Sequence, residues 1–507
     1  MFSIVKSCGL HGIEGYMVTV ETDMSNGLPA FEMVGLADAS IREAKERVRS
    51  AIKNSGFEFP IRRITVNLAP AWIRKEGSCF DLSIAAGLLL STGQIVCPDI
   101  SEYLLIGELS LNGELKPVKG VLPMTICALK SGMRKVIVPK GNGREASIVK
   151  DIKVFEAEDI LQCVSHLQGE SMLPLIEFDT DNYLKSQSEY GIDFSDVKGQ
   201  NCAKRALEIA ASGRHHIMMI GSPGSGKTML AKRMPTILPE MTFEEALEVT
   251  KIHSISGLLK QDVPLIKERP FRDPHYSISA CALVGGGKYP KPGEISMAHN
   301  GVLFLDEMTE FDSDVLEVLR QPIEEGMVNI SRHNGCVAYP SRFMLVCAAN
   351  PCRCGNLWSN PSKCTCSTAQ IRNYKSKLTS ALMDRIDIFV QISPLKIEDI
   401  RDCSNQETSK DIRKRVNNAR KIQIDRYSNE GISSNSELTG KLVEKYCPID
   451  EKSMDLILKA VKKLGLSARA YTSIIKVART IADLHEDGAI DFSHVAEALQ
   501  YRNIYKN

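Results

Sequence analysis

The segment Gly221-Ser222-Pro223-Gly224-Ser225-Gly226-Lys227-Thr228 is the point from which the architecture of this chain can be worked out. It matches G-x-x-x-x-G-K-[ST], the phosphate-binding loop, in which backbone N–H groups surround phosphate oxygens at a helix N-terminus. The apolar run 217–220 before it predicts a buried strand, and residues 229–233 after it predict a helix. Lys227 can reach the β- and γ-phosphates, and the Thr228 hydroxyl can ligate Mg²⁺. The sequence therefore predicts a site for ATP and Mg²⁺.

Two further apolar runs end in polar residues that suit such a site. Residues 302–305 (VLFL) predict a buried strand, and Asp306 and Glu307 follow at its carboxyl end. In a parallel sheet beside the phosphate loop, Asp306 would join the Mg²⁺ shell and Glu307 would act as general base on the attacking water. The run 343–349 ends at Asn350, which resembles the sensor-1 position of AAA+ ATPases and would help to hold that water. The alternative is an Asn-Pro turn that only ends the strand.

Composition limits the class of protein. A chain of 507 residues predicts two to four domains. With 63 basic and 62 acidic side chains the net charge is +1, so any nucleic-acid-binding surface must be local. No stretch resembles a signal peptide or a membrane span, so a membrane partner is not expected. The fifteen cysteines lie mostly singly in apolar patterns, which favours reduced, buried thiols and a cytoplasmic location.

The order of elements predicts an α/β chain of three domains and a linker. Residues 1–167 alternate strands (15–24, 63–68, 103–109, 135–138) and helices (40–52, 123–131). A polar, aperiodic segment at 168–190 is the predicted linker. Residues 191–393 predict an ATPase core with a parallel sheet. Residues 394–507 predict a helical lid, with helices at 411–427, 441–446, 452–464, 468–484 and 492–501.

The N-terminal domain resembles the proteolytic domain of Lon-type proteases, a ribosomal S5 domain 2-like fold, in residues 74–93 and 107–139. That family uses a Ser–Lys dyad, in which a desolvated lysine activates the serine. Cys79 falls at the serine position and Met124 at the lysine position. Because the base is missing, we expect Cys79 to be a core residue and the domain not to be a protease.

Two arginines are candidates for charge stabilisation in the transition state. Arg385, in the segment LMDRID at 382–387, resembles the arginine finger of magnesium-chelatase and MCM-type motors, which reaches the γ-phosphate on a neighbouring subunit. The alternative is an ion pair with Asp384 or Asp387. Arg469, in LSARA at 466–470, resembles the start of a sensor-2 helix, and Arg479 on the same helix is the second choice.

Four cysteines form a separate candidate site. Cys352, Cys354, Cys364 and Cys366 follow the pattern C-x-C-x9-C-x-C in a polar, loop-like segment. Four thiolates within this reach suit tetrahedral Zn²⁺, whose role would be to fix the loop after the sensor strand. Free thiols, or a site with fewer ligands, are the alternatives.

The loop 285–293 (GGGKYPKPG) is the candidate DNA contact. Lys288 and Lys291 flank Tyr289 between glycines and prolines, so the loop could project into the pore of a ring and hold a strand by phosphate pairing and stacking. A solvated loop without a partner is the alternative. The basic segment 413–421 is expected to be a charged outer face.

Taken together, these motifs resemble the magnesium-chelatase-like AAA+ family known as YifB or ComM. The resemblance extends over PFRDPHYSISACALVGGGKYPKPGEISMAHNGVLFLDEM, VLEVLRQPIEEGMVNISR, ANPCRCG, ALMDRIDIFV, the N-terminal GLADASIREAKERVRSAI and SARAYTSIIKVARTIADL in the lid. It differs at Arg353, where the family has proline, which leaves the cysteine ligands untouched. The resemblance implies a homohexameric ATPase of the helix-2-insert group, and ComM members drive branch migration of DNA in transformation. A protein-remodelling or metal-chelatase-type motor acting on a protein partner is the alternative; no metal-dependent adhesion motif D-x-S-x-S is present.

Overall fold

The computed structural model describes residues 1–185, 190–260, 263–287, 290–332, 335–358, 361–378, 382–394 and 406–502. The chain forms two compact units, each with its own core. The N-terminal unit is Met1–Gln187 with Ala246–Ile266, and the second unit is Ser188–Glu245 with Lys267–Asn507. Residues 246–266, in the middle of the predicted ATPase core, therefore group with the N-terminal unit. No helix in the described part of the chain combines the length and the apolar character needed to cross a bilayer.

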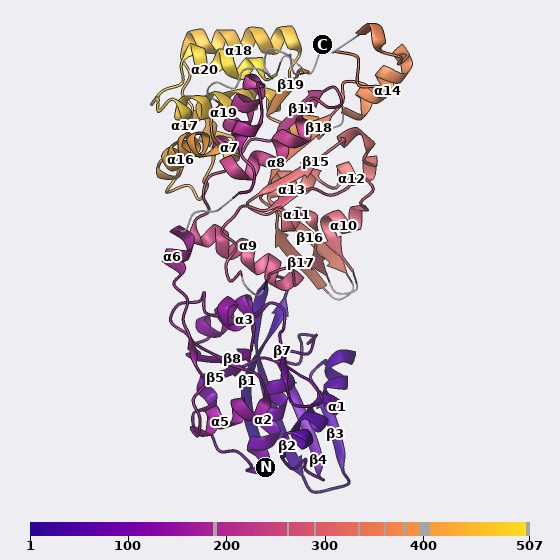
Figure 1. The fold of residues 1–507 in the computed structure, drawn as a ribbon, viewed down its shortest axis with the longest axis vertical. Helices are drawn as coiled ribbons and strands as arrows, with labels where there is room; N and C mark the ends of the chain where they lie inside the picture. Colours follow the sequence, from indigo (N-terminus) through magenta and orange to yellow (C-terminus); the bar gives the residue numbers. More distant parts are fainter. Residues whose placement is uncertain are drawn as a thin grey trace. The chain divides into compact units, whose positions relative to one another are not determined.

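The N-terminal unit is built on an eight-stranded mixed sheet in the order β10-β9-β8-β5-β1-β2-β4-β3 (Figure 1). Strands β1, β2 and β4 pair antiparallel, as do β9 and β10, and the other neighbours are parallel. The strands are β1 (Phe2–His11), β2 (Glu14–Ser25), β3 (Ala30–Val34), β4 (Arg63–Ala69), β5 (Tyr103–Leu105), β8 (Lys135–Pro139), β9 (Lys153–Ala157) and β10 (Leu175–Ile176). A small hairpin, β6 (Glu108–Leu109) with β7 (Leu115–Lys116), lies outside this sheet.

Sequence periodicity accounts for these elements. In β2, Val18, Val20, Thr22 and Met24 alternate into the core while their neighbours do not. Helix α2 (Asp81–Thr92) is buried over nearly its whole length, as its apolar run requires. The other helices are α1 (Ala39–Asn54), α3 (Val121–Lys130), α4 (Gly143–Ala146) and α5 (Ile160–Gln168). The predicted linker segment contains β10 and α6 (Thr180–Lys185).

The two positions aligned with the protease dyad lie in the core. Cys79 is 6% exposed and Met124 is 2% exposed. Burial raises the pKa of the Cys79 thiol to about 12, so the thiol stays protonated at neutral pH. Cys79 is thus a core residue in this structure, as the missing base led us to expect.

The second unit contains a five-stranded parallel sheet in the order β12-β15-β18-β11-β19. The strands are β12 (Phe271–Arg272), β15 (Val302–Leu305), β18 (Met344–Ala349), β11 (Ile217–Gly221) and β19 (Ile388–Ile392) (Figure 1). All residues of β11, β15 and β18 are buried, which explains their continuous apolar runs. The carboxyl ends of these strands form one edge of the sheet.

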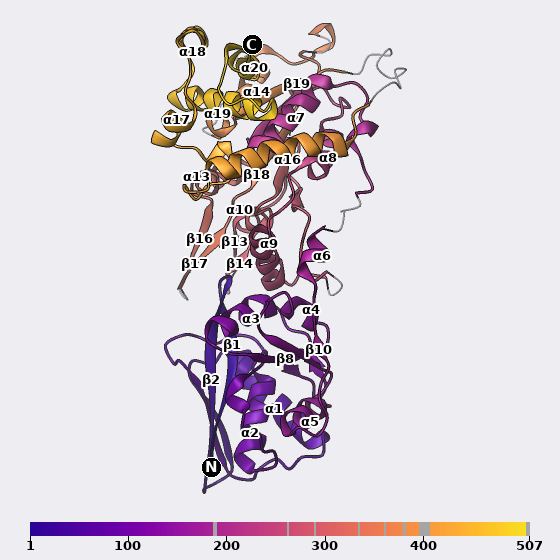
Figure 2. The same ribbon diagram turned by 90° about the vertical axis from the view of Figure 1, so that its left-hand side faces the viewer.

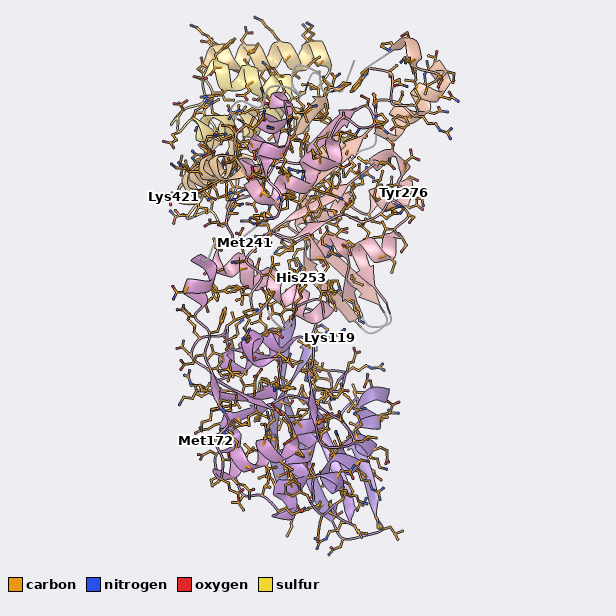
Figure 3. All side chains as sticks on the ribbon, in the orientation of Figure 1. Lys119, Met172, Met241, His253, Tyr276 and Lys421 are labelled. Carbon is orange, nitrogen blue, oxygen red and sulfur yellow. The ribbon has the colours of Figure 1, made fainter. Side chains whose placement is uncertain are left out.

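Helices of the predicted lid share one core with this sheet. They are α16 (Ser409–Arg426), α17 (Lys441–Tyr446), α18 (Glu451–Leu464), α19 (Ala468–Leu484) and α20 (Phe492–Gln500). Helix α16 packs against α7 (Asn201–Gly213) and α8 (Lys227–Ile237) (Figure 2). Lys421 points outward from α16, as expected for a charged face (Figure 3). Arg420 beside it differs from that expectation, because it is buried and donates to the carbonyls of Ser433 and Ala211.

Short elements complete the second unit. Two hairpins, β13 (Gly285–Gly286) with β14 (Lys291–Pro292) and β16 (Met327–Arg332) with β17 (Gly335–Pro340), form two-stranded sheets apart from the five-stranded sheet. The remaining helices are α9 (Phe243–Ser256), which runs into the segment that groups with the N-terminal unit, α10 (Ala280–Val284), α11 (Glu294–Met297), α12 (Ser313–Glu317), α13 (Arg320–Glu325) and α14 (Thr368–Leu378).

Candidate functional site

The phosphate-loop segment, residues 221–228, connects the end of β11 to the start of α8. Gly226 has φ of 92°, a left-handed conformation that favours glycine and lets the loop turn into the helix. The Lys227 Nζ donates to the carbonyl oxygens of Gly221 at 2.7 Å and Ser222 at 2.9 Å. Burial lowers the pKa of Lys227, and the charges of Asp306 and Glu307 oppose that shift. Lys227 is therefore held by carbonyl groups of the phosphate loop itself.

Asp306 and Glu307 follow β15 directly. The Thr228 hydroxyl donates to Asp306 Oδ2 at 2.7 Å, and the Glu307 N–H donates to Asp306 Oδ1 at 2.9 Å. Glu307 has φ of 48°, a left-handed conformation that is uncommon for a residue with a side chain. A hydroxyl and a carboxylate oxygen are ligands that suit Mg²⁺, so Thr228 and Asp306 together fit this ion.

Asn350 follows β18, the strand that lies between β11 and β15. Its Oδ1 accepts a hydrogen bond from Lys227 Nζ at 3.2 Å. The structure thus brings together Lys227, Thr228, Asp306 and Asn350 at the carboxyl edge of the sheet. Such an edge is the usual binding position of ligands in open α/β sheets.

A further carboxylate, which we did not predict, belongs to the same edge. Asp273 comes directly after β12, the neighbour of β15. Burial raises its pKa; Lys232 acts against this shift, and the charge of Asp306 adds to it. The strand before Asp273 has only two residues, so it gave no apolar run from which the position could be recognised.

Arg385 and Arg469 lie at the opposite, amino edge of the sheet. Arg385 ends the 3₁₀ turn just before β19, and its Nη2 donates to Glu324 Oε1 at 2.5 Å. Arg469, at the start of α19, donates to the same oxygen of Glu324. Arg385 thus forms an ion pair with Glu324, whereas sequence reasoning suggested Asp384 or Asp387. Asp387 instead accepts from Ser473 at 2.5 Å and contacts His215 Nδ1 at 3.2 Å.

The surroundings of these arginines differ from those of the alternative, Arg479. Arg385, Arg469 and Glu324 line a cavity of about 770 Å³. The side chain of Arg479 is 1% exposed, pairs with Asp483 at 3.0 Å and donates to two backbone carbonyls. Arg479 thus contributes to the core of the lid, and Arg469 is the one of the two that lines a cavity. Sequence reasoning did not identify Glu324, because it is remote in sequence from both arginines.

The four predicted cysteine ligands lie together. Their sulfur atoms all lie within 4.8 Å of one another. The Sγ–Sγ distances are 3.4 Å from Cys352 to Cys354, 3.9 Å from Cys352 to Cys364 and 3.6 Å from Cys354 to Cys364. Tetrahedral Zn²⁺ with Zn–S bonds of about 2.3 Å requires sulfur atoms about 3.8 Å apart. Backbone N–H groups of Asn356 and Thr365 lower the pKa of Cys354 to about 6, which favours the thiolate. The donor set fits Zn²⁺.

The cysteine loop contacts the phosphate loop. Gly355 has φ of 79°, and a Cβ placed there would lie 2.2 Å from Cδ of Pro223. The backbone after Cys354 therefore lies directly against residue 223 of the phosphate loop, where a larger side chain has no room. The conformation of one loop constrains the other.

The candidate DNA contact is described only in part. Lys288 and Tyr289 lie outside the described residues. Lys291 is exposed in β14 and pairs with Gly286 of β13. The Tyr339 hydroxyl of β17 donates to the carbonyl of Pro290 at 2.7 Å, so the two hairpins are linked beside this loop.

Family models for magnesium chelatase match three consecutive parts of the chain. Residues 193–400 match the family model described as magnesium chelatase, subunit ChlI. Residues 20–142 match the model for subunit ChlI of Mg-chelatase, and residues 406–502 match the model for the ChlI C-terminal region. The chain is similar, with 27% identity over 208 residues, to the magnesium-chelatase 67 kDa subunit of Chlorobaculum parvum, covering 40% of this chain and 27% of that protein.

Two relatives match over nearly their whole length. The competence protein ComM of Haemophilus influenzae is 42% identical over 504 residues, which cover 99% of this chain and 97% of ComM. YifB of Escherichia coli is 40% identical over 507 residues, with the same coverage of 99% and 97%. With these full-length matches and the three chelatase models, the chain belongs to the magnesium-chelatase-like AAA+ ATPase family that includes YifB and ComM.

Proposed function

We propose that this chain hydrolyses ATP at the carboxyl edge of the second unit's sheet and uses the energy to remodel DNA. The observation that carries the ATPase part is the contact of Thr228 with Asp306, at 2.7 Å, next to Lys227 and Asn350. Lys227 would bind the β- and γ-phosphates. Thr228 and Asp306 would hold Mg²⁺, which supplies charge neutralisation when bound. Glu307 would take the proton of the attacking water, and Asn350 would orient that water.

The site would be completed by a neighbouring copy of the chain in a ring, which the family resemblance implies to be a homohexamer. The support is the separation of the groups, since Arg385 and Arg469 lie at the sheet edge opposite the phosphate loop. Neither arginine can reach the loop of its own chain while it pairs with Glu324. In a head-to-tail ring, the amino edge of one copy can face the loop of the next. There Arg385 and Arg469 would stabilise the charge that develops on the γ-phosphate.

DNA as the substrate rests on the resemblance to ComM and on the loop with Lys288, Tyr289 and Lys291. The proposed ligand is single-stranded or branched DNA, held by phosphate pairing and base stacking without reading its sequence. The cysteine cluster would bind a structural Zn²⁺, whose effect on the ATP site passes through Gly355 and Pro223.

The experiment is ATP hydrolysis by the full chain, measured without DNA and with single-stranded, duplex and four-way-junction DNA. We expect at least one of these DNA structures to stimulate ATP hydrolysis by the wild-type chain, and none to stimulate it in Lys227→Ala. The variant that tests the loop is Lys291→Ala, which should weaken DNA binding and reduce the stimulation of hydrolysis by DNA. Hydrolysis that no DNA stimulates, together with the absence of salt-sensitive DNA binding, would refute the DNA motor and favour a protein partner.

A further inference from the structure

A cavity of about 910 Å³ in the N-terminal unit has a strongly basic lining. It is lined by residues of α1, of strands β3 and β4, and of the loop 56–62. Four basic side chains line it, namely Lys45, Arg49, Lys53 and Arg62, and Glu58 is the one acidic side chain among the lining residues. The whole chain is nearly neutral, so this excess of positive charge is local.

Three of the cations form a stripe along one face of α1. Lys45, Arg49 and Lys53 are spaced four residues apart, so successive side chains are about 6 Å apart along the helix axis. Like charges at this spacing repel each other. In the described chain, the structure records no ion pair for these three residues. Arg47, on another face of the same helix, instead pairs with Asp81 at 2.8 Å. The stripe is therefore left for an external anion.

Aromatic rings line the same cavity. Phe31, Phe57 and Phe59 are half-buried, so each packs on the core and leaves part of its ring at the cavity. The ring centroids of Phe31 and Phe59 are 6.1 Å apart, and the Arg49 guanidinium lies 5.6 Å from the Phe59 ring. Cations interleaved with exposed ring faces are the combination that single-stranded nucleic acids require, because phosphates pair with the cations and bases stack on the rings. An acidic peptide would use the cations alone.

We infer that this groove binds single-stranded nucleic acid, with the phosphates on the α1 stripe and bases against Phe31 and Phe59. The inference deepens the proposed function and rests on it for the identity of the ligand. None of the residues that line the groove belongs to the ATP site or to the loop at 285–293. A strand held here would be bound without nucleotide and without dependence on hydrolysis.

The test is fluorescence anisotropy of a labelled thymidine oligonucleotide with the full chain, without nucleotide and at several salt concentrations. The variant is Lys45→Gln/Arg49→Gln/Lys53→Gln, which keeps good helix formers at exposed or half-exposed positions. The matched control is Lys130→Gln/Arg144→Gln/Lys153→Gln, three exposed cations of the same unit that do not line the groove. Both variants lose the same charge.

We expect the stripe variant to bind at least about tenfold more weakly, with a salt slope lower by about 2, and the control to bind nearly as the wild type. Phe31→Leu should weaken binding about fivefold or more with the salt slope unchanged. Melting temperatures of the variants, measured in parallel, show whether each is folded.

Three results would overturn the inference. If the folded stripe variant binds like the control, the groove is not the site, and the proposed DNA motor stands. If a poly-glutamate peptide, or vesicles containing phosphatidylserine, bind the stripe as tightly as the oligonucleotide, the ligand class is wrong. If the wild-type chain binds no nucleic acid under any of these conditions, both the inference and the proposed DNA substrate fail.

Discussion

The separation of Glu307 and Arg385 predicts that two inactive variants restore each other's activity. Strands β11 and β19 are parallel, with Ile217 opposite Ile388 and Gly221 opposite Ile392. Four residue steps of strand, about 13 Å, separate those pairs, and Arg385 lies before the first while the phosphate loop lies after the last. This distance exceeds the reach of an arginine side chain. On this geometry, one chain would not supply both halves of the proposed site.

The perturbation removes one half of the proposed ATP site in one chain and the other half in a second chain. Arg385→Ala keeps the loop and the Glu307 base, whereas Glu307→Gln keeps the arginine and the ability to bind ATP. Each variant alone should lose about 10³-fold or more of the hydrolysis rate, since an arginine finger contributes that much and the base is essential. In an equal mixture of randomly assembled rings, about one interface in four joins an intact loop to an intact arginine. We expect the mixture to recover up to about a quarter of the wild-type rate.

The assay is steady-state ATP hydrolysis after the two chains have been mixed and exchanged, with native mass spectrometry to count mixed rings. The control is Arg385→Ala mixed with the double variant Glu307→Gln/Arg385→Ala, in which no interface has an arginine. That mixture should stay inactive at the same ring composition. Mixed rings that form and yet hydrolyse no faster than either variant alone would refute a site shared between copies.

Three other predictions test neighbouring features. Cys354→Ser should lower the zinc content and raise the KM for ATP, because the cysteine loop packs on the phosphate loop; zinc near zero in the wild type under reducing conditions would contradict this. Glu324→Gln should leave kcat within about threefold of the wild type, with ATP affinity unchanged, because both arginines would exchange the weak, half-exposed pairing with Glu324 for the phosphate; a loss of about 10-fold or more would show that Glu324 has to hold them during hydrolysis. Burial lowers the pKa of His216 from 6.5 to about 4. As the pH falls through that range only the unfolded chain takes up the proton, so the free energy of unfolding of the second unit should fall by up to about 3 kcal/mol. His216→Asn keeps an acceptor for the N–H of Leu345 and should flatten the pH dependence of the urea midpoint, whereas an equal dependence would rule out His216 as the cause.

The features that sequence reasoning could predict are those with a local signal. Strand β2 and helix α19 matched their expected ranges closely, because apolar periodicity reports which face of an element is buried. The convergence of Thr228 and Asp306 followed from the rule that parallel strands end at one edge. The four cysteines met because their spacing is short enough for one loop to bring them together.

The features that sequence reasoning could not predict depend on packing between distant segments. Glu324 is 61 residues from Arg385 and 145 residues from Arg469, and no local pattern relates a helix end to two remote arginines. Strand β12 and its Asp273 were missed because two residues carry no periodicity. The grouping of residues 246–266 with the N-terminal unit depends on contacts such as the Ser254 hydroxyl with the Glu145 carboxylate, which cannot be read from either segment alone.

In the proposed shared site, Glu324 would keep the two arginines away from the nucleotide until a neighbouring copy is present. Its carboxylate pairs with both Arg385 and Arg469 through one oxygen, which offsets part of their combined positive charge. The Glu324 side chain is 40% exposed, so this pairing is weak enough to be exchanged for a phosphate. A γ-phosphate carries more negative charge than one carboxylate and offers three oxygens in place of one shared oxygen. The arginines would therefore move toward the nucleotide only when a neighbouring loop presents ATP, and hydrolysis would be tied to assembly of the ring.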